Sequence, residues 1–528
     1  MCYLLHDIFI STVKRKPSNN AIIAEDGERI TYHNLNLLAN KFANLFLKFK
    51  NDTRENPYIG IISSVHINSI AAVLGTLKIG CAYIPLDEYS PTERLAHIIE
   101  NTNLDIIVVD SAIYKNHCKL FEKSQIKHVV ITGENKLISK KADKCIPFNN
   151  VLQESAKESR EFNQVSDDLA YILHSSGSTG IPKGIMLTHR NARTFVDWMQ
   201  KEFKLTENDK VMSRAPFKFD LSVFDIFNTF NAGAALICYD WNKNREEEKK
   251  HSDYVKLMEK EKATILYTTP STFISLMNKG NLGQAKLKLR EIMYAGEPFP
   301  VPQLKKLQSC LPNTKIANIY GPTETNIITY YWINNILSDN SVVPLGKVVD
   351  DTEILIVAET NDRICKLNEI GEIWCRGGTV TIGYLGMSEK TKEHLALSPF
   401  HKYPVYFWRT GDYGYRDENG CLYYKGRKDN MIKVKGYRIE IGEIETAISK
   451  YSALDEFAVV AMSDEKYNNR LYCYYSVLKN CSISEKDLKI FLSAKLPEYM
   501  IPFKFTELEV LPKTSSGKID RVLLSKKF

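Results

Sequence analysis

The chain has 528 residues, of which 44% are hydrophobic and 25% charged, so it is long enough for two or three separately packed parts of ordinary globular composition. Its formal net charge of +7 is small for this length and its lysines are dispersed, which argues against a face that binds DNA or RNA. No segment approaches the roughly 18 to 20 apolar residues that a membrane-spanning helix needs. The 11 cysteines form no C-x-x-C pair, so we expect reduced, mostly buried thiols in a cytoplasmic protein.

Strand-like and helix-like segments alternate through the first 130 residues. Residues 21–24 and 29–31 are expected to form a short hairpin, and Thr31 is expected to cap a helix whose apolar residues recur at helical spacing between 35 and 46. The other elements predicted in this part are strands at 58–63, 106–109 and 128–131 and a helix at 69–79. Repeated strand–helix units of this kind favour an α/β fold of mostly parallel sheets covered by helices.

A loop rich in glycine and hydroxyl side chains covers residues 175–184, with the sequence SSGSTGIPKG. A strand is predicted before this loop, at 169–174, and a helix after it, at 187–203. Glycines let the backbone curl around an anion, while the hydroxyls and Lys183 add donors and charge. Because Lys183 is followed by Gly184, the loop is not the G-x-x-x-x-G-K-[ST] loop of P-loop nucleotidases. The loop predicts phosphate binding, most simply of a nucleotide.

Three later segments combine a predicted strand with a turn signal. The predicted strands at 263–268 and 291–294 each end in a turn, and the sequence NIYGPTE at 318–324 follows another strand. Ligands of open α/β sheets bind where strands end at their carboxyl edge, so we expect these turns to lie together. A fourth segment, FDLSVFDIF at 219–227, stands between predicted strands at 211–214 and 235–239. The charged run 242–250 is interpreted as a solvated loop or helix face.

The character of the sequence changes at about residue 344, where shorter strands rich in β-branched residues and glycine begin. These strands predict a small β-barrel-like subdomain. A basic hairpin with its turn at Gly436 follows, and the helices and strands beyond it are sufficient for a small α+β domain. We therefore predict a large domain over 1–428, with 344–428 as its β-rich part, and a small domain over 429–528.

The loop at 175–184 resembles the phosphate loop of the adenylate-forming superfamily, which contains acyl-CoA synthetases, beetle luciferases and the adenylation domains of nonribosomal peptide synthesis. Segments at 318–324, 409–412 and 515–521 resemble further motifs of that superfamily, in the expected order along nearly the whole chain. The resemblance implies an enzyme that uses ATP and Mg²⁺. It also implies a small C-terminal domain that rotates about a hinge at Asp429 between two half-reactions.

The resemblance assigns an ATP site residue by residue. Glu324 matches the magnesium-binding glutamate, Asp412 the aspartate on the ribose hydroxyls, and Lys518 the lysine that stabilises developing charge in the first step. The catalytic residues on this assignment are Lys518, Glu324, Thr179 and Thr323. The ATP-binding residues are Ser175, Ser176, Gly177, Ser178, Thr179, Gly180, Lys183, Gly296, Glu297, Pro298, Asn318, Tyr320, Gly321, Thr323, Asp412, Arg427 and Lys518.

The resemblance also assigns the acid that is activated. Asp220 matches the aspartate that holds the substrate α-ammonium in amino-acid-activating members, and a carboxylate facing an apolar pocket is costly unless a cation pairs with it. The other aligned pocket positions, all apolar except one, are Leu221, Phe224, Thr272, Met293, Ala295, Ile319, Ile327 and Ile328. Leu221 and Phe224 should shorten the cavity, which favours a small or medium aliphatic side chain. The run FVDW at 195–198 resembles free-standing enzymes that load proline or alanine onto carriers, which implies a substrate of that kind.

The expected function is activation of an amino acid to an aminoacyl-adenylate, followed by transfer to a phosphopantetheine thiol. Since the chain ends seven residues after Arg521, the thiol is expected on a separate carrier protein. Two alternatives remain open at this point. One is an acyl-CoA synthetase for a fatty or aryl acid, which Asp220 argues against. The other is a catalytically silent nucleotide-binding relative, which Lys518, Glu324 and Asp412 argue against.

Overall fold

The structure of the chain is a computed structural model, and it describes residues 3–50, 57–133, 144–158, 162–175, 182–241, 246–334, 342–427, 431–434, 436–464, 468–478, 483–513 and 519–526. The chain divides into two compact units. The first unit comprises Met1–Glu88, Ile99–His174 and Gly184–Gly426, and the second comprises Tyr89–Ile98, Ser175–Lys183 and Arg427–Phe528. The predicted boundary after residue 428 stays a prediction, because residues 428–430 lie outside the described residues.

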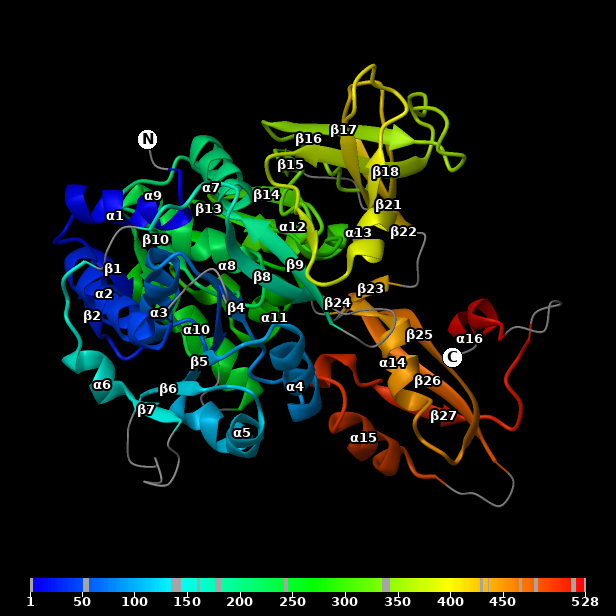
Figure 1. The fold of residues 1–528 in the computed structure, drawn as a ribbon. Helices are drawn as coiled ribbons and strands as arrows, with labels where there is room; N and C mark the ends of the chain where they lie inside the picture. Colours follow the sequence, from blue (N-terminus) through cyan, green and yellow to red (C-terminus); the bar gives the residue numbers. More distant parts are fainter. Residues whose placement is uncertain are drawn as a thin grey trace. The chain divides into compact units, whose positions relative to one another are not determined.

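A nine-stranded sheet forms one half of the first unit (Figure 1). Its strands, in spatial order, are β16 (Lys347–Val348), β15 (Thr329–Trp332), β14 (Lys315–Tyr320), β13 (Glu291–Tyr294), β12 (Ile265–Thr268), β10 (Lys210–Met212), β11 (Ala235–Ile237), β1 (Asn20–Ile23) and β2 (Arg29–Thr31). The central pairs from β14 to β1 are parallel, and the pairs at both ends are antiparallel. The predicted hairpin of residues 21–31 is therefore confirmed as the antiparallel pair of β1 and β2.

An eight-stranded sheet forms the other half of the same unit. Its strands, in spatial order, are β19 (Gly383–Tyr384), β9 (Lys183–Thr188), β8 (Leu169–Ser175), β4 (Ala82–Pro85), β3 (Tyr58–Ile62), β5 (Ile106–Asp110), β6 (His128–Thr132) and β7 (Cys145–Pro147). The pairs from β8 to β7 are parallel, as the alternation of strands and helices predicted.

A smaller sheet of five strands follows in the chain. It contains β17 (Thr352–Val357), β18 (Gly371–Gly377), β20 (Leu395–Leu397), β21 (Tyr406–Arg416) and β22 (Leu422–Arg427). The pairs β17–β18, β18–β21 and β20–β21 are antiparallel, as is typical of sheets built from short strands and tight turns.

Helices cover the large sheets, and some of them, such as α2 and α7, bury one stripe of apolar residues. Thr31 caps α2 through a hydrogen bond from the Asn34 amide to its hydroxyl oxygen (3.2 Å), as predicted, and α2 packs against α3. The helices of this unit are α1 (Leu5–Arg15), α2 (Tyr32–Phe49), α3 (Ile67–Lys78), α5 (Ser111–Lys123), α6 (Phe148–Gln153), α7 (His189–Phe203), α8 (Leu221–Val223), α9 (Thr229–Ala232), α10 (Glu247–Glu261), α11 (Pro270–Lys279), α12 (Val301–Cys310) and α13 (Ser388–His394), with a 3₁₀ turn at Leu282–Gln284. Helix α4 (Thr92–Asn101) has residues in both units. No helix within the described ranges is long and apolar enough to cross a bilayer.

The second unit contains the predicted basic hairpin and a small α+β assembly. Strands β23 (Met431–Val434) and β24 (Tyr437–Glu440) pair antiparallel around Gly436, whose φ is +84°. A three-stranded sheet of β25 (Leu454–Asp464), β26 (Asn468–Val477) and β27 (Lys504–Glu507) carries α14 (Ile441–Ile448), α15 (Glu485–Ser493), a 3₁₀ turn (Glu498–Met500) and α16 (Arg521–Lys526).

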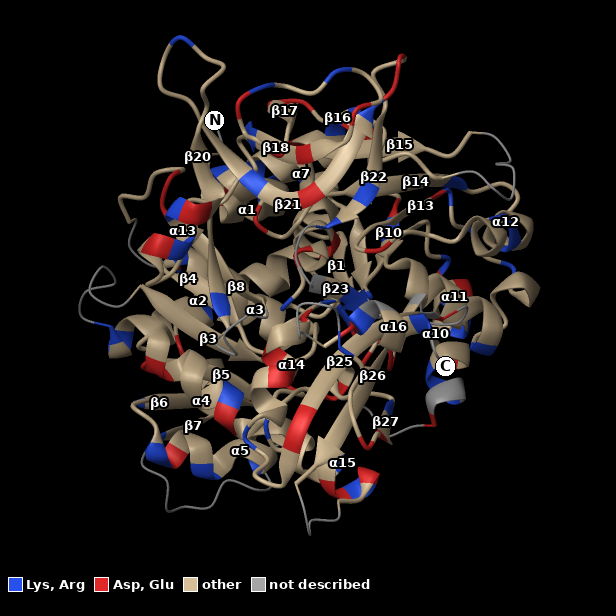
Figure 2. Ribbon diagram, turned by 90° about the vertical axis from the view of Figure 1, so that its right-hand side faces the viewer, with Lys and Arg blue, Asp and Glu red and all other residues tan. Residues whose placement is uncertain are grey.

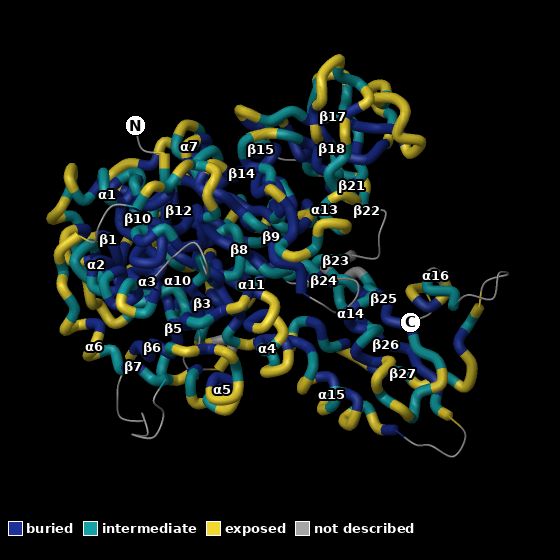
Figure 3. The backbone as a smooth tube through the Cα atoms, in the orientation of Figure 1, coloured by how far each residue is buried: buried dark blue, intermediate teal, exposed yellow. Residues whose placement is uncertain are grey.

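The surface and the interior differ as the composition predicts. Buried residues follow the strands of the two large sheets (Figure 3). Basic and acidic side chains interleave on outer helices such as α5, α13 and α15 (Figure 2). The expectation of mostly buried thiols is wrong for the described cysteines: four of the nine are buried and five are partly exposed, all as free thiols. Several lie on helices and short strands near the surface, which composition does not reveal.

Two sequence predictions about the elements flanking turns need correction. The helix expected at 187–203 begins at His189, because residues 183–188 form β9, a short, largely buried strand next to β8. The loop at 175–184 therefore connects two neighbouring strands. Asn318 to Tyr320 were expected to follow a strand, but they are the last three residues of β14.

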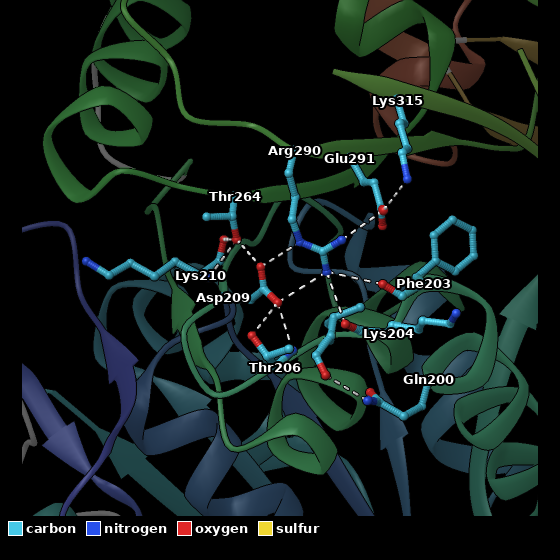
Figure 4. A network of polar contacts seen from close by, with 11 residues as sticks. Gln200, Phe203, Lys204, Thr206, Asp209, Lys210, Thr264, Arg290, Glu291 and Lys315 are labelled. Atoms are coloured by element: carbon cyan, nitrogen blue, oxygen red, sulfur yellow. Dashed lines mark hydrogen bonds and ion pairs between the residues drawn. The ribbon is translucent and has the colours of Figure 1, made fainter. Parts of the chain in front are cut away.

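A network of polar and charged side chains lies at the amino edge of the nine-stranded sheet, where its parallel strands begin (Figure 4). Asp209, just before β10, accepts hydrogen bonds from Arg290 Nε (2.8 Å) and from Thr264 Oγ1 (2.8 Å). Arg290, just before β13, also donates to the Phe203 carbonyl (3.1 Å). Burial alone would raise the pKa of Asp209, but the hydrogen bonds from Arg290, Thr206 and Thr264 outweigh it and lower the pKa below its ordinary value. This network ties together the starts of three strands.

Candidate active site

The carboxyl edge of the same sheet brings the predicted turns together. Thr268 of β12 lies opposite Tyr294 of β13, and Tyr294 lies opposite Asn318 of β14. Because these strands are parallel and in register, the turns that follow them leave the sheet at one edge. The expectation that the turns lie close together is confirmed.

Two glycines shape the turns at this edge. Gly296 has φ +92°, a conformation that side chains with a Cβ rarely adopt. At Gly321 a Cβ would lie 1.9 Å from the carbonyl oxygen of Asn326, so no larger residue fits there. The chain after β14 therefore folds back tightly, and the Ile328 amide donates to the Tyr320 carbonyl (2.9 Å).

Tyr320 and Asp412 meet although they are 92 residues apart in the sequence. The Tyr320 hydroxyl donates to Asp412 Oδ2 (2.6 Å), and both residues are buried. Burial raises the pKa of Tyr320 well above its ordinary value, and the charge of Asp412 adds to the effect, so the phenol keeps its proton. On the same strand, Asn318 Nδ2 donates to the Pro344 carbonyl (2.7 Å). The structure thus pairs Tyr320 with Asp412 and places Asn318 on the same strand as Tyr320.

Glu324 is almost completely buried, with 1% of its surface exposed. Its Oε1 accepts a hydrogen bond from the hydroxyl of Tyr384 (2.7 Å). A carboxylate offers two oxygens and about four lone-pair sites, so this contact uses one part of its capacity. Mg²⁺ in nucleotide sites is commonly held by one or two carboxylates together with substrate phosphates, so one buried glutamate fits that role. No cluster of three or more metal-ligating side chains occurs among the described residues.

Glu297 and Thr272 both lie at the start of α11. Glu297 Oε2 accepts hydrogen bonds from the amide of Ser271 (3.2 Å) and from its hydroxyl. Thr269 caps the same helix, and its hydroxyl lies 3.1 Å from Thr272 Oγ1. Glu297 therefore holds the turn after β13 against the helix that follows β12, with Pro298 next in the chain.

Asp220 stands at the start of an irregular helical segment that sequence periodicity did not predict. Helix α8 runs into a π-helical turn, Phe224–Asn228, and then into α9. Single π turns inside helices frequently occur at functional sites. Asp220 is partly buried, and its charge contributes to the raised pKa values of Tyr171 and Tyr267, for which burial is the largest cause. Since Tyr171 lies on β8 and Tyr267 on β12, Asp220 lies where the two large sheets approach each other.

The predicted apolar pocket residues gather on one face of the nine-stranded sheet. Along β13 and β14, Met293 and Ile319 face the core that the two large sheets share, while their neighbours Ile292 and Ile316 face the opposite core under α10 to α12. Phe224 packs edge-on against Tyr267 with ring centroids 5.3 Å apart. The pocket candidates that belong to the shared core, or pack against it, are Leu221, Phe224, Met293, Ala295, Ile319, Ile327 and Ile328.

Asp225, in the π turn, is a second acid that sequence reasoning did not single out. Its Oδ2 accepts from Ser213 Oγ (3.3 Å) and from the amides of Arg214 (3.2 Å) and Ala215 (3.4 Å). Its buried Oδ1 has no hydrogen-bond partner among the described residues. Burial raises the pKa of Asp225 to about 7, against the lowering effect of these hydrogen bonds. The acid ties the π turn to the end of β10.

The predicted phosphate loop is described only at its two ends. Ser175 closes β8, and its buried hydroxyl has no hydrogen-bond partner among the described residues. Lys183 Nζ lies 2.5 Å from Glu440 Oε1, and both residues belong to the second unit. Thr323 is partly exposed in its turn, and Arg427 ends β22. The remaining predicted residues lie outside the described residues: Ser176, Gly177, Ser178, Thr179, Gly180, Asp429 and Lys518.

Sequence reasoning missed Tyr171, Tyr267, Tyr384 and Asp225. The two strand tyrosines precede predicted turns, so a search for phenols near strand ends could have found them. Tyr384 contacts a residue 60 positions away, and no local pattern indicates that contact.

Comparison with known proteins places the chain in a family. A profile described as AMP-binding enzyme matches residues 9–385, and one described as AMP-binding enzyme C-terminal domain matches residues 443–518. The L-proline--[L-prolyl-carrier protein] ligase of Pseudomonas fluorescens is 30% identical over 99% of this chain and 99% of that protein. Bacitracin synthase 1 of Bacillus licheniformis is 31% identical over 98% of this chain, which spans 9% of that much longer protein.

A solved structure supports the fold. The amide bond synthetase McbA from Marinactinospora thermotolerans superposes with a TM-score of 0.86 over 98% of this chain and 99% of that chain, at 18% identity. The α/β architecture with a large N-terminal and a smaller C-terminal part is thus confirmed. Because the AMP-binding profile covers well over half of the sequence, this chain belongs to the AMP-binding enzyme family.

Proposed function

We propose that the protein activates an amino acid with ATP and transfers the aminoacyl group to the phosphopantetheine thiol of a carrier protein. Asp220 is the single observation that carries the amino-acid assignment. It precedes Leu221, which packs against the apolar core that includes Met293 and Ile319, and its charge acts on the phenols of Tyr171 and Tyr267. A carboxylate in such surroundings is stabilised by a cationic partner, and the α-ammonium of an amino acid supplies one.

The first half-reaction forms an acyl-adenylate. A carboxylate oxygen of the amino acid bonds to the α-phosphorus of ATP, the bond from that phosphorus to the bridging oxygen breaks, and pyrophosphate leaves with the electron pair. The reaction depends on positioning and charge neutralisation, and no side chain forms a covalent bond to the substrate. In the second half-reaction the thiol sulfur bonds to the carbonyl carbon, AMP leaves with the electron pair of the broken carbon–oxygen bond, and the thiol proton passes to solvent.

The proposed roles on the ATP side follow the residues of β14 and its turn. Asp412, oriented by Tyr320, accepts the two ribose hydroxyls, and the turn at Gly296 to Pro298 packs against adenine. Glu324 holds Mg²⁺, which neutralises phosphate charge when it is bound. The phosphate loop with Lys183 binds the phosphates, Lys518 stabilises the charge that develops in the first step, and Asp429 serves as the hinge.

Substrate size follows from the pocket candidates. Phe224 is fully buried and Leu221 is partly buried, and both stand on the segment that begins with Asp220. Two bulky side chains next to the anchoring carboxylate leave room for a small or medium apolar side chain, such as that of proline or alanine. A full-length relative named as a prolyl-carrier protein ligase supports both this substrate class and a separate carrier protein as acceptor.

An ATP–pyrophosphate exchange screen over the amino acids tests the proposal. We expect exchange with one or a few small or medium apolar amino acids, and little with charged ones. Deaminated analogues of the best substrate provide the matched control, because they keep the side chain and lose the ammonium group. Exchange with an alkanoic or aryl acid that equals the best amino acid would reject the amino-acid assignment, and acid-dependent CoA thioester formation would identify an acyl-CoA synthetase.

A further inference from the structure

Residues 381–384 contact both the main chain and the side chain of Glu324. The Thr381 amide donates to the main-chain carbonyl of Glu324 (2.7 Å), and the Tyr384 hydroxyl donates to its carboxylate (2.7 Å). Backbone and side chain of the buried glutamate are therefore fixed by the same neighbour. A glutamate side chain rotates broadly about its last torsion, so the second contact restricts the plane of the carboxylate.

The same stretch is anchored to β9. Thr381 Oγ1 donates to the Met186 carbonyl (2.6 Å), and Tyr384 lies opposite Ile185 in an antiparallel pair. At Gly383, φ is +132° and a Cβ would lie 2.5 Å from the Thr391 side chain, so this pairing requires glycine. The position of Glu324 is thus set relative to the strand that leaves the phosphate loop.

The ring of Tyr384 cannot easily turn away from the carboxylate. It is 2% exposed and packs edge-on against His394 (5.8 Å between centroids) and Trp408 (5.5 Å). The Tyr384 amide donates to Thr391 Oγ1 (3.0 Å). Removing only the hydroxyl should keep all of this packing, because phenylalanine has the same ring.

We propose that Tyr384 is a positioning residue for the metal site: its hydroxyl orients the Glu324 carboxylate for Mg²⁺. The inference rests on the metal role given to Glu324 in the proposed function. Side chains that orient a metal ligand typically change metal affinity or activity about 10- to 100-fold when they are removed. Tyr384 supplies that orientation through a neutral hydroxyl, which brings no positive charge of its own to the carboxylate.

Calorimetric binding of ATP to the full chain at a series of Mg²⁺ concentrations, without an acid substrate, tests the inference. Tyr384→Phe should raise the Mg²⁺ concentration for half-maximal ATP binding about 10-fold, with ATP affinity at saturating Mg²⁺ close to the parent value. Tyr32→Phe is the matched control. It removes an equally buried hydroxyl that donates to the Ala234 carbonyl (2.7 Å), and it should leave the Mg²⁺ requirement unchanged.

Glu324→Gln separates this inference from the proposed function. A raised Mg²⁺ requirement in Glu324→Gln but not in Tyr384→Phe overturns the role of Tyr384 and leaves the metal role of Glu324 standing. An unchanged requirement in both variants rejects the metal role and the inference together.

The double variant Glu324→Gln/Tyr384→Phe completes the test. It should match Glu324→Gln, since the hydroxyl then has no carboxylate to orient. A Mg²⁺ requirement about 10-fold higher in the double variant than in Glu324→Gln would show that the hydroxyl acts elsewhere, and would overturn the inference.

Discussion

The two edges of the nine-stranded sheet both contain buried acids, but the donors that hold those acids differ. At the amino edge, Asp209 accepts from the guanidinium of Arg290 (2.8 Å). At the carboxyl edge, Glu324 accepts from the phenol of Tyr384 and Asp412 from the phenol of Tyr320. A guanidinium compensates the charge of its partner, which suits a contact that stabilises the sheet.

A phenol orients a carboxylate without neutralising it. Tyr384 and Tyr320 therefore help to fix Glu324 and Asp412 without bringing a positive charge of their own, which suits a site proposed to bind a metal ion and a ribose. The two edges thus differ in the donors that contact these three acids: a cationic guanidinium at the amino edge and neutral phenols at the carboxyl edge. Four substitutions test whether this difference separates a contact that stabilises the fold from contacts that serve binding.

The largest effect is expected at Asp220. Asp220→Asn should lower amino-acid activation roughly 10²- to 10⁴-fold, because loss of one partner of a buried charge pair costs about 3–5 kcal/mol. ATP binding should stay near the parent value. Pyrophosphate exchange with the best amino acid and with its deaminated analogue measures the effect. The substitution should lower exchange with the analogue only slightly. Equal losses for both compounds would assign Asp220 to the fold instead of the ammonium site.

At the amino edge the effect should fall on stability. Asp209→Asn removes the charge that Arg290 pairs with and should cost about 1.5–3 kcal/mol, seen as a lower melting temperature. Activity per folded molecule should not change. Asp167→Asn is the control, since its ion pair with Arg190 is exposed on both sides and should contribute little. An Asp209→Asn variant that melts like the parent but binds substrate poorly would assign the amino edge to binding and not to stability.

Tyr320→Phe tests the phenol at Asp412. Loss of a hydrogen bond to a charged group should weaken ATP binding by about 10-fold or somewhat more, with little change in amino-acid affinity. Tyr294→Phe is the matched control on the next strand, because its hydroxyl faces the opposite core and has no hydrogen-bond partner among the described residues. Direct measurement of ATP binding to both variants decides whether the phenol matters to the nucleotide.

The last effect concerns the pH dependence of stability at Asp225. The unfolded carboxyl ionises near 3.8, whereas burial raises the pKa of folded Asp225 to about 7. The folded state therefore holds an extra proton between these values, and the contribution of this group to stability falls as pH rises from about 4 to 7. Asp225→Asn should remove that decline, so its stability relative to the parent should increase over this window.

Asp209→Asn should show the opposite sign in the same experiment. The pKa of Asp209 is lowered, so its contribution to stability is complete above about 3.8 and is lost as pH falls further. Thermal unfolding of both variants and the parent from pH 2 to pH 8 compares the two acids. Parallel curves for Asp225→Asn and the parent would mean that Asp225 ionises in its ordinary range.

Local signals in the sequence were sufficient for much of the fold. Thr31 before a helix, the hairpin at Gly436 and the turns after β12 and β13 were all predicted, because capping, positive φ and strand ends depend on a few adjacent residues. The shared face of Met293 and Ile319 likewise agrees with the two-residue period of a strand. The family motifs, also readable in the sequence, indicated the adenylate-forming fold.

Packing between distant segments decided the rest. The six residues of β9 form a strand between β8 and β19. The sequence alone did not indicate this strand, and the helix was predicted to begin at residue 187. The π turn at 224–228 places Asp225 against the end of β10, a contact that helical periodicity does not indicate. The pairs Tyr320–Asp412 and Tyr384–Glu324 join residues 92 and 60 positions apart, so their chemistry exists only after the sheets have formed. Local propensity acts over a few neighbouring residues, and the donors that orient these acids are brought to them by tertiary structure.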